Sequence, residues 1–484
     1  MFIIRGVTVK ILINKWKKIP NSAKSSIAFV FCSLFVKGFI FIVTPLFTRI
    51  MTMDDYGIVT TYNSWVSILE IFAILGLTSA GVFNIGLKDN KNKRDEYISS
   101  CLGLCNITTF IVFALILIGK VIFGNDFILS NKLLLCMFVH FLFNPAQIFW
   151  ITRQRYEYKY KLATLVSIVS VVVAQLFSVV SILLFDGDVA FNKIMSNELG
   201  LLVFTIPIYI ILLKKGKDYI NLKRWKSILY LAIPLIPHYL AQHVMASSDK
   251  IMISNFVSSG DAAIYGVVAN ISMIGTIFWN AINASLIPYT HEKIETKKYN
   301  HINALCKKLL IGYFVVQCLI LLIAPEILSI LAPPSYSKGV YCIPPLIFVI
   351  YLNALYNMFA NIEFYHKKTK GIAVSTVIAA AINLLLNYIF IPYFSYVAAA
   401  YTTMISNVVL VFLHYLFYKK TETNNVYDIS FILKISIFQF LFSGLCNFLY
   451  FNSLIRYLFI ILIIIIIICK RKNIIETIKT LKSS

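Results

Sequence analysis

Several ionisable side chains interrupt long apolar stretches of this sequence, and they are the first candidates for chemistry. Lys37 lies in the middle of the apolar segment 27–48, and Glu70 lies near the centre of the segment 58–84. A charge inside an apolar segment is costly and usually faces a cavity or an opposite charge. Two interpretations stay open for Glu70: a structural ion pair with Lys37, and a role in binding a substrate or a coupling ion.

Two stretches that are far apart in the sequence resemble each other. The stretch from Arg49 to Gly57 and the stretch from Lys250 to Gly266 both begin with a cation followed by Ile-Met, and both end in Tyr-Gly. This similarity predicts two related halves, the second of which begins near Lys226. Arg49 and Lys250 could extend towards lipid headgroups, but their matched positions favour a paired role in binding.

A polar stripe runs along the apolar segment 227–248. Helical spacing places His238, Gln242 and Asp249 on one side of this segment. We therefore expect His238 and Gln242 to contact a substrate, and we expect Asp249, like Glu70, to couple ions. Two other segments carry similar stripes, in which the polar side chains could equally serve as contacts between helices: His140, Asn144 and Gln147 in one, and Asn353, Asn357 and Asn361 in the other.

The composition identifies a membrane protein. The chain has 484 residues, of which 59% are hydrophobic and 13% are charged, whereas about a quarter of the residues in a soluble domain are charged. Apolar segments of about 18 residues or more, each able to cross a hydrocarbon core of about 30 Å, recur along the whole chain. We predict an all-α polytopic membrane protein with about fourteen transmembrane helices.

The predicted spans form two groups of six and a final pair. They lie at about 27–48, 58–84, 97–119, 130–151, 163–185, 195–213, 227–248, 262–287, 305–331, 341–364, 371–392, 396–418, 429–450 and 454–469. The predicted parts of the chain are a basic interfacial segment (1–24), an N-lobe (25–213), a basic linker (214–226), a C-lobe (227–418), a helix pair (429–470) and a basic tail (471–484).

Basic residues are concentrated in every second connection between these spans. The net charge is +23, and 35 of the 44 lysines and arginines lie in those connections and in the termini. The positive-inside rule assigns these segments, and with them both termini, to the cytoplasm. The positive charge therefore reflects topology and attraction to anionic membrane lipids, and it does not predict binding to nucleic acid.

Signatures of enzymes and of metal sites are not found in the sequence. It contains no Gly-rich phosphate loop, no H-E-x-x-H and no G-x-S-x-G motif. None of the nine cysteines forms a C-x-x-C pair, and most of them lie within apolar segments, where a thiol behaves as a small hydrophobic group. We therefore predict a protein that is not an enzyme and that needs no metal or cofactor apart from a coupling ion.

Three stretches connect the sequence with a known family. They are TPLFTRIMTMDDYG at 44–57, IPLIPH at 233–238 with SDKIMI at 248–253, and NLLLNYIFIP at 383–392 followed by VAAA at 397–400. In these stretches, and over about residues 25–470 as a whole, the sequence resembles the polysaccharide-export family of the multidrug/oligosaccharidyl-lipid/polysaccharide (MOP) transporters. The resemblance is strongest to the Wzx-type flippases of lipid-linked O-antigen units.

The resemblance implies two six-helix lobes around a central cavity, plus two C-terminal helices, in the bacterial inner membrane. It also implies that the protein moves an undecaprenyl-pyrophosphate-linked oligosaccharide across that membrane by alternating access, driven by a gradient of protons or sodium ions. Lys37, Arg49 and Lys250 are the cations that would meet the pyrophosphate. Membrane lipids, a polysaccharide polymerase and a chain-length regulator are the implied partners.

Two alternatives stay open. The first is an exporter of another lipid-linked glycan, such as a capsular unit, a teichoic acid or a peptidoglycan precursor. The second, from a different class, is a membrane polymerase or ligase that acts on lipid-linked sugars. An enzyme would transfer sugars in detergent without any gradient, whereas a flippase would lose translocation, but not substrate binding, when the gradient is collapsed.

Overall fold

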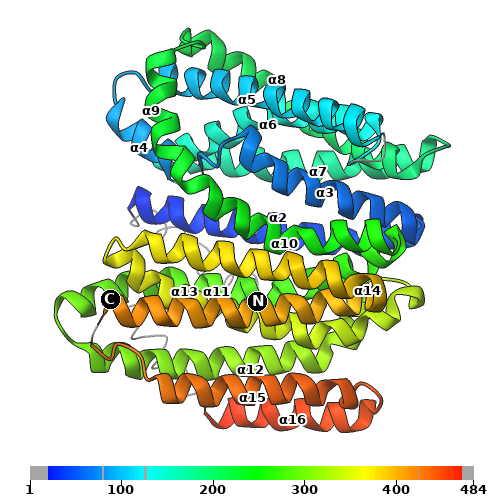
Figure 1. The fold of residues 1–484 in the computed structure, drawn as a ribbon, viewed down its shortest axis with the longest axis vertical. Coiled ribbons are helices and arrows are strands. Elements are labelled where there is room, and N and C mark those ends of the chain that lie inside the picture. Colours follow the sequence, from blue (N-terminus) through cyan, green and yellow to red (C-terminus); the bar gives the residue numbers. More distant parts are fainter. Residues whose placement is uncertain (1–19, 79–80, 125–127, 423, 471–484) are drawn as a thin grey trace, which may run out of the picture. The chain divides into compact units, whose positions relative to one another are not determined.

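The computed structural model describes residues 20–78, 81–124, 128–422 and 424–470. Most of the predicted interfacial segment 1–24 and the whole of the predicted tail 471–484 lie outside these residues. Within the described residues all regular secondary structure is helical (Figure 1). The prediction of an all-α membrane protein is confirmed.

The helices follow one another through short connections. In the first half of the chain they are α2 (Asn21–Ile50), α3 (Met53–Ala73), α4 (Val82–Asp89), α5 (Arg94–Phe123), α6 (Asn131–Tyr156), α7 (Tyr160–Leu184), α8 (Val189–Gly216) and α9 (Leu222–Ala232). In the second half they are η1 (Ile233–Leu235), α10 (Ile236–Phe256), α11 (Ser259–Glu295), α12 (Tyr299–Leu331), η2 (Pro334–Cys342), α13 (Ile343–Tyr365), α14 (Thr369–Thr421), α15 (Ile429–Leu449) and α16 (Ser453–Cys469).

The predicted membrane spans correspond to these helices. Among the described residues, 11 helices are long and apolar enough to cross a membrane. One of them, the 53-residue α14, covers the two predicted spans 371–392 and 396–418, because the chain continues helically on both sides of a kink. The 21-residue α3 and the 17-residue α16 match two further predicted spans. The chain is a multi-pass membrane protein.

Two breaks in helical geometry separate helices that would otherwise be continuous. Ser395, with φ 52° and ψ −144°, is the non-helical residue inside α14, and its hydroxyl donates to Asp261 Oδ2 at 3.0 Å. Pro234 lies in the 3₁₀ turn η1 between α9 and α10, where its missing N–H disfavours a continuous α-helix. Pro45 lies inside the single helix α2.

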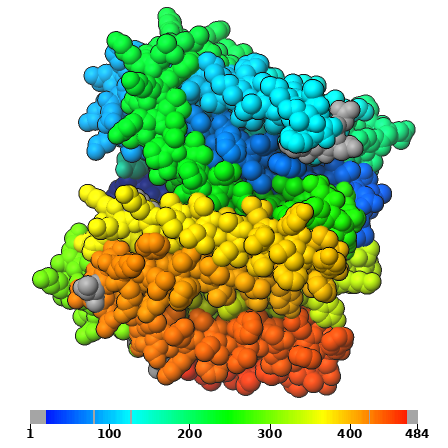
Figure 2. Space-filling view, in the orientation of Figure 1, coloured from blue at the N-terminus to red at the C-terminus, as the bar shows by residue number. Residues whose placement is uncertain are grey.

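The chain divides into two compact units. Unit 1 comprises residues 1–43 and 66–239, and unit 2 comprises residues 44–65 and 240–484. In unit 1, α7 packs on α8, and α8 packs on α5 and α6. In unit 2, α13 packs on α14, α11 packs on α12 and α13, and α12 also contacts α15 and α16, as Figure 1 shows. In Figure 2 the side chains of α15 and α16, in orange and red, cover one face of unit 2.

Unit 2 includes the first part of α3 because that part packs closely against the start of α11. A Cβ atom on Gly57 would lie 1.8 Å from the carbonyl oxygen of Ser259, and one on Gly266 would lie 2.7 Å from Thr60 Cγ2. The backbone N–H of Gly260 also donates to Asp54 Oδ1 at 2.9 Å. We call this region the glycine contact. It lies at the Tyr-Gly ends of the two similar stretches, 49–57 and 250–266.

The glycine contact gives a direct test of this packing. Gly57→Ala should lower the free energy of unfolding by about 1–3 kcal/mol, the usual cost of overpacking, because the added methyl group meets backbone. Thermal unfolding in detergent can be followed with a thiol-reactive dye, since eight of the cysteines are buried. Gly312→Ala is the matched control in unit 2, because a Cβ atom there would meet no atom within 4 Å. Equal unfolding temperatures for the two variants would contradict the close contact.

Candidate functional site

A buried carboxylate on α10 organises an extensive polar cluster of unit 2. Asp249 is 2% exposed. Its carboxylate accepts hydrogen bonds from Tyr265 Oη at 2.5 Å, from Thr403 Oγ1 at 2.7 Å and from Asn387 Nδ2 at 2.7 Å. The three donors come from α11 and from the two parts of α14. One carboxylate on α10 therefore ties α11 to both parts of α14.

A second layer of polar side chains surrounds this carboxylate. Asn383 donates to Thr403 Oγ1 at 3.1 Å, and its own amide oxygen accepts from Ser248 Oγ at 3.3 Å. Thr402 donates to the amide oxygen of Asn387. All of these side chains are buried. We call these residues the Asp249 cluster: Asp249, Tyr265, Asn387, Thr403, Asn383, Ser248 and Thr402.

The kink of α14 allows that helix to supply two sides of the Asp249 cluster. Asn383 and Asn387 precede Ser395, and they are one helical turn apart, so they face the same direction. Thr402 and Thr403 follow Ser395. The break thus places an amide pair and a hydroxyl pair around the same carboxylate.

The donor set of the Asp249 cluster suits a small hard cation. Carboxylate, amide and hydroxyl oxygens are the ligands that such ions prefer. In this structure the carboxylate accepts three hydrogen bonds, and Asn387 presents its N–H to it, so these side chains would have to turn to bring their oxygens to an ion. Within the described parts of the chain, no group of three or more His, Cys, Asp and Glu side chains could hold a metal ion. The cluster instead combines one carboxylate with several neutral oxygens.

Unit 1 contains a different buried arrangement, which is centred on His140. His140 Nδ1 lies 2.8 Å from Glu198 Oε2, and the side-chain amide of Asn144 lies 3.1 Å from His140 Nε2. The carboxylate of Glu70 is close enough to act electrostatically on the same imidazole. Glu70, predicted as an ion-coupling residue, therefore lies near a histidine that could carry a proton.

A second histidine–carboxylate pair lies in unit 2. His414 Nδ1 and Glu363 Oε1 are 2.6 Å apart, and both side chains are fully buried. The ring of Tyr356 stands edge-on to His414, with 4.7 Å between the ring centroids. Gln242, a predicted substrate-binding residue, donates to Tyr356 Oη at 3.1 Å. Gln242 is thus connected to the His414–Glu363 pair through Tyr356.

The predicted cations occupy different environments. Lys37 is an exposed residue in the middle of α2, and the ion pairs of the described residues do not include a Lys37–Glu70 pair. Arg49 donates to the carbonyls of Pro45 at 2.9 Å and of Ser329, near the end of α12, at 3.3 Å. Lys250 is half-buried, and its ammonium lies 3.4 Å from the carbonyl of Ala246. His238 is buried beside the Tyr239 ring.

Most partners of Asp249 are not evident from the sequence. Asn383 and Asn387 belong to a stretch that carries the family resemblance, and as two Asn side chains at i and i+4 in an apolar segment they also form a polar stripe. Tyr265 belongs to the repeated Tyr-Gly. The pair Glu363–His414 joins α13 to α14 and has no signal in the spacing of polar residues. Periodicity shows which residues share a face, but it does not show which helix that face meets.

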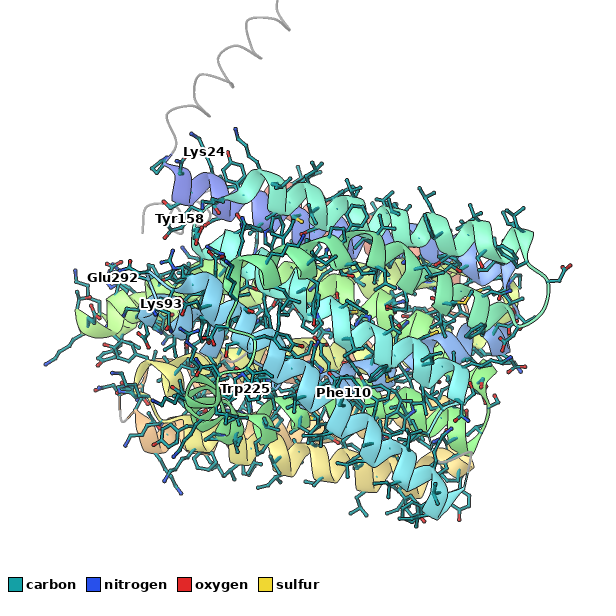
Figure 3. The ribbon with its side chains drawn as sticks, turned by 90° about the horizontal axis from the view of Figure 1, so that it is seen from above. Lys24, Lys93, Phe110, Tyr158, Trp225 and Glu292 are labelled. Carbon is teal, nitrogen blue, oxygen red and sulfur yellow. The ribbon has the colours of Figure 1, made fainter. Side chains whose placement is uncertain are left out.

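The basic connections of unit 1 form an ion-pair network at one end of its helices. Glu157 contacts Arg94, Arg153 and Lys159 at 2.6–3.1 Å, and Arg153 also pairs with Asp95. Partial burial would raise the pKa of Glu157, but the hydrogen bonds from Lys159 and Arg153 outweigh it and lower this pKa to about 2. In Figure 3 the labelled Lys24, Lys93 and Tyr158 lie at this end, away from Phe110.

The sequence matches a known family over more than half of its length. The family described as "Polysaccharide biosynthesis protein" matches residues 22–294. "Lsg locus putative protein 1" of Haemophilus influenzae is 26% identical over 77% of this chain and 93% of its own. "Capsular polysaccharide biosynthesis protein CapF" of Staphylococcus aureus is 23% identical over 78% of this chain and 95% of its own.

Solved structures share the fold over most of the chain. The lipid II flippase MurJ, in an inward closed conformation, superposes with a TM-score of 0.64 and 18% identity, over 93% of this chain and 100% of its own. An outward-facing multidrug resistance MATE family transporter of the MOP superfamily gives a TM-score of 0.56 and 14% identity, over 83% of this chain and 96% of its own. This chain therefore shares its fold with MurJ and with this MATE transporter.

The His414–Glu363 pair makes a prediction about stability. Glu363→Ala should reduce the free energy of unfolding by about 3–5 kcal/mol, because removing one partner of a buried pair leaves the other without compensation. The double variant Glu363→Met with His414→Leu should recover most of that loss, since apolar groups of similar size can replace a buried pair. Thermal unfolding of the purified variants measures both effects. A double variant no more stable than Glu363→Ala would contradict the pairing.

Proposed function

Because the chain belongs to the polysaccharide biosynthesis protein family, we propose that it is a flippase that carries a lipid-linked glycan across the bacterial inner membrane. Its substrate would be an undecaprenyl-pyrophosphate-linked oligosaccharide, such as an O-antigen repeat unit. The observation that carries this proposal is the joint match to this family and to the fold of the lipid II flippase MurJ, the latter over 93% of the chain. No enzyme motif in the sequence competes with it.

The cations of the helices would recognise the substrate's charged group. A pyrophosphate interacts with a lysine or arginine in a low-dielectric setting more strongly than it would in water. Lys37 lies inside the apolar α2, and the ion pairs of the described residues leave it unneutralised. Arg49 and Lys250 would add to this attraction, and His238 and Gln242 would contact the sugars.

The relatives leave a second glycan substrate open. One of them is named for capsular polysaccharide, and the similar fold of MurJ is that of a lipid II flippase. A capsular or peptidoglycan-precursor unit would present the same pyrophosphate with different sugars. A membrane polymerase or ligase is the competing class, and sugar transfer by the purified protein in detergent, without any gradient, would favour it.

The Asp249 cluster would couple transport to an ion gradient. Its carboxylate is surrounded by hydroxyl and amide groups from α11 and both parts of α14. Binding of a sodium ion or a proton would neutralise the buried charge and change which of these groups it attracts. Glu70, beside His140 and Glu198, would be a second coupling group in unit 1. Alternating access would then follow the occupancy of these sites.

The topology that fits this function places both termini in the cytoplasm. The connections rich in lysine and arginine would then face the cytoplasm and its anionic lipids. A lipid-linked unit would enter from that side, where such units are assembled, and would leave on the opposite side. A polysaccharide polymerase and a chain-length regulator would use the exported unit.

The predicted substrate cations can be tested in cells. Lys37→Ala and Arg49→Ala should each abolish surface polysaccharide when they replace the wild-type gene, while membrane insertion stays normal. Removing a phosphate-binding cation commonly costs about 1.5–3 kcal/mol, which is enough to stop slow export. Lys338→Ala, an exposed lysine of η2, is the control and should export normally. Wild-type export by both test variants would remove these residues from the site.

The coupling role of Asp249 can be tested in proteoliposomes. Asp249→Asn keeps the shape of the side chain but removes its charge, so substrate should still bind while gradient-driven translocation is lost. Separate sodium and proton gradients identify the ion. The control is Asp186→Asn, at an exposed carboxylate in the connection before α8. If Asp249→Asn retained full gradient dependence, the cluster would have only a structural role.

A further inference from the structure

Unit 1 contains a cavity to which the proposed function assigns no role. Its volume is about 350 Å³, within the range of sites that bind small ligands, and it is lined by Thr78, Asn84, Ile148, Thr152, Arg155 and Tyr156. These residues come from the end of α6, from α4 and from the turn before α4. Hydroxyl, amide and guanidinium groups line it, and none of its lining residues is acidic.

Arg155 differs from the arginines around it. Arg94 and Arg153 are neutralised by Glu157 and Asp95 in the network described above. The ion pairs of the described residues do not include Arg155, and its side chain is exposed. The low pKa of Glu157 keeps that carboxylate charged and committed to its own partners. The cavity therefore has a positive charge that no described carboxylate compensates.

The side chain of Arg155 is positioned rather than freely mobile. Its guanidinium lies over the ring of Phe29 on α2, 4.8 Å from the ring centroid. Stacking on an aromatic face uses the face of the guanidinium and leaves its N–H edges free to donate. Those edges form a planar fork that matches the geometry of phosphate oxygens. Tyr156 and Asn84 line the same cavity and offer further polar contacts to a group attached to that phosphate.

We propose that this cavity is a docking site for the diphosphate of the lipid-linked glycan, occupied at the basic end of unit 1 before translocation. The proposal rests on the proposed function for the identity of the ligand. Arg155 would bind the phosphate oxygens, and the Thr, Asn and Tyr side chains would contact the first sugar. The site lies at the end of the helices where Arg94, at the start of α5, pairs with Glu157, just after α6, so it would collect substrate from the leaflet on that side.

Binding of undecaprenyl diphosphate tests this proposal. The full-length protein is placed in nanodiscs of neutral phosphatidylcholine, and occupancy by the added lipid is measured by native mass spectrometry. Arg155→Ala should weaken binding by about tenfold or more, the usual effect of losing a charge-assisted contact. Asn84→Leu should also weaken binding, because it fills the cavity without altering the charge.

The matched control is Lys161→Ala, which removes the same charge from an exposed residue at the start of α7, beyond the cavity lining. It should bind like wild type, whereas an equal loss in Lys161→Ala would show that only general electrostatic attraction is measured. Unchanged binding by Arg155→Ala would overturn the proposal.

Two further measurements separate the possible ligands and the two proposals. In the first, phosphatidylglycerol is added at the same concentration as undecaprenyl diphosphate. If it displaces undecaprenyl diphosphate, and if this depends on Arg155, the assignment to the substrate is overturned and the cavity is a site for anionic phospholipid.

In the second, translocation by the wild type is measured in proteoliposomes. Arg155-dependent binding without any translocation by wild type would refute the proposed function while leaving a diphosphate site. Translocation by wild type with unchanged binding by Arg155→Ala would refute only the docking site.

Discussion

The close approach of α3 and α11 at Gly57 and Gly266 is the constraint on which the organisation of unit 2 depends. Helices in a membrane gain little from burying apolar side chains against each other, because lipid is equally apolar. Small residues that let two backbones meet are therefore an effective way to hold them together. At Gly57 the space for a side chain is already filled by the carbonyl of Ser259, and Asp54 caps the first turn of α11 through Gly260.

The same short motif connects this packing with the polar chemistry of unit 2. Gly266 packs against Thr60, while the preceding residue, Tyr265, donates to Asp249. A shift of α11 along α3 would move the tyrosine hydroxyl away from the carboxylate. Because an unsatisfied charge is very costly in a low-dielectric interior, the glycine contact and the Asp249 cluster stabilise one arrangement of these helices together. In the second Tyr-Gly pair, the glycine thus allows close helix packing, and the tyrosine hydrogen-bonds to the buried carboxylate.

Features that depend on the local pattern of residues, such as the membrane spans, could be predicted from the sequence. Apolar length identified the spans, and the charge of Asp249 within an apolar helix marked it as unusual. The similarity of the two Tyr-Gly stretches was also visible, but their contact with each other was not. The pairs His140–Glu198 and His414–Glu363 escaped prediction because each joins two helices whose rotation about their own axes is fixed only by packing. The same limit applies to Lys37 and Glu70, which share no ion pair among the described residues although both interrupt neighbouring apolar segments.

The break at Ser395 has a consequence for any ion held by Asp249. Its backbone lies at positive φ, a conformation that a serine adopts only when its surroundings impose it, and Asp261 holds the side chain in place. The amides of Asn383 and Asn387 precede this joint, and the hydroxyls of Thr402 and Thr403 follow it. The bend angle of α14 therefore sets the spacing between these two groups of side chains around the carboxylate. If the carboxylate bound an ion that prefers one spacing, linkage would require that ion to favour the corresponding bend as well.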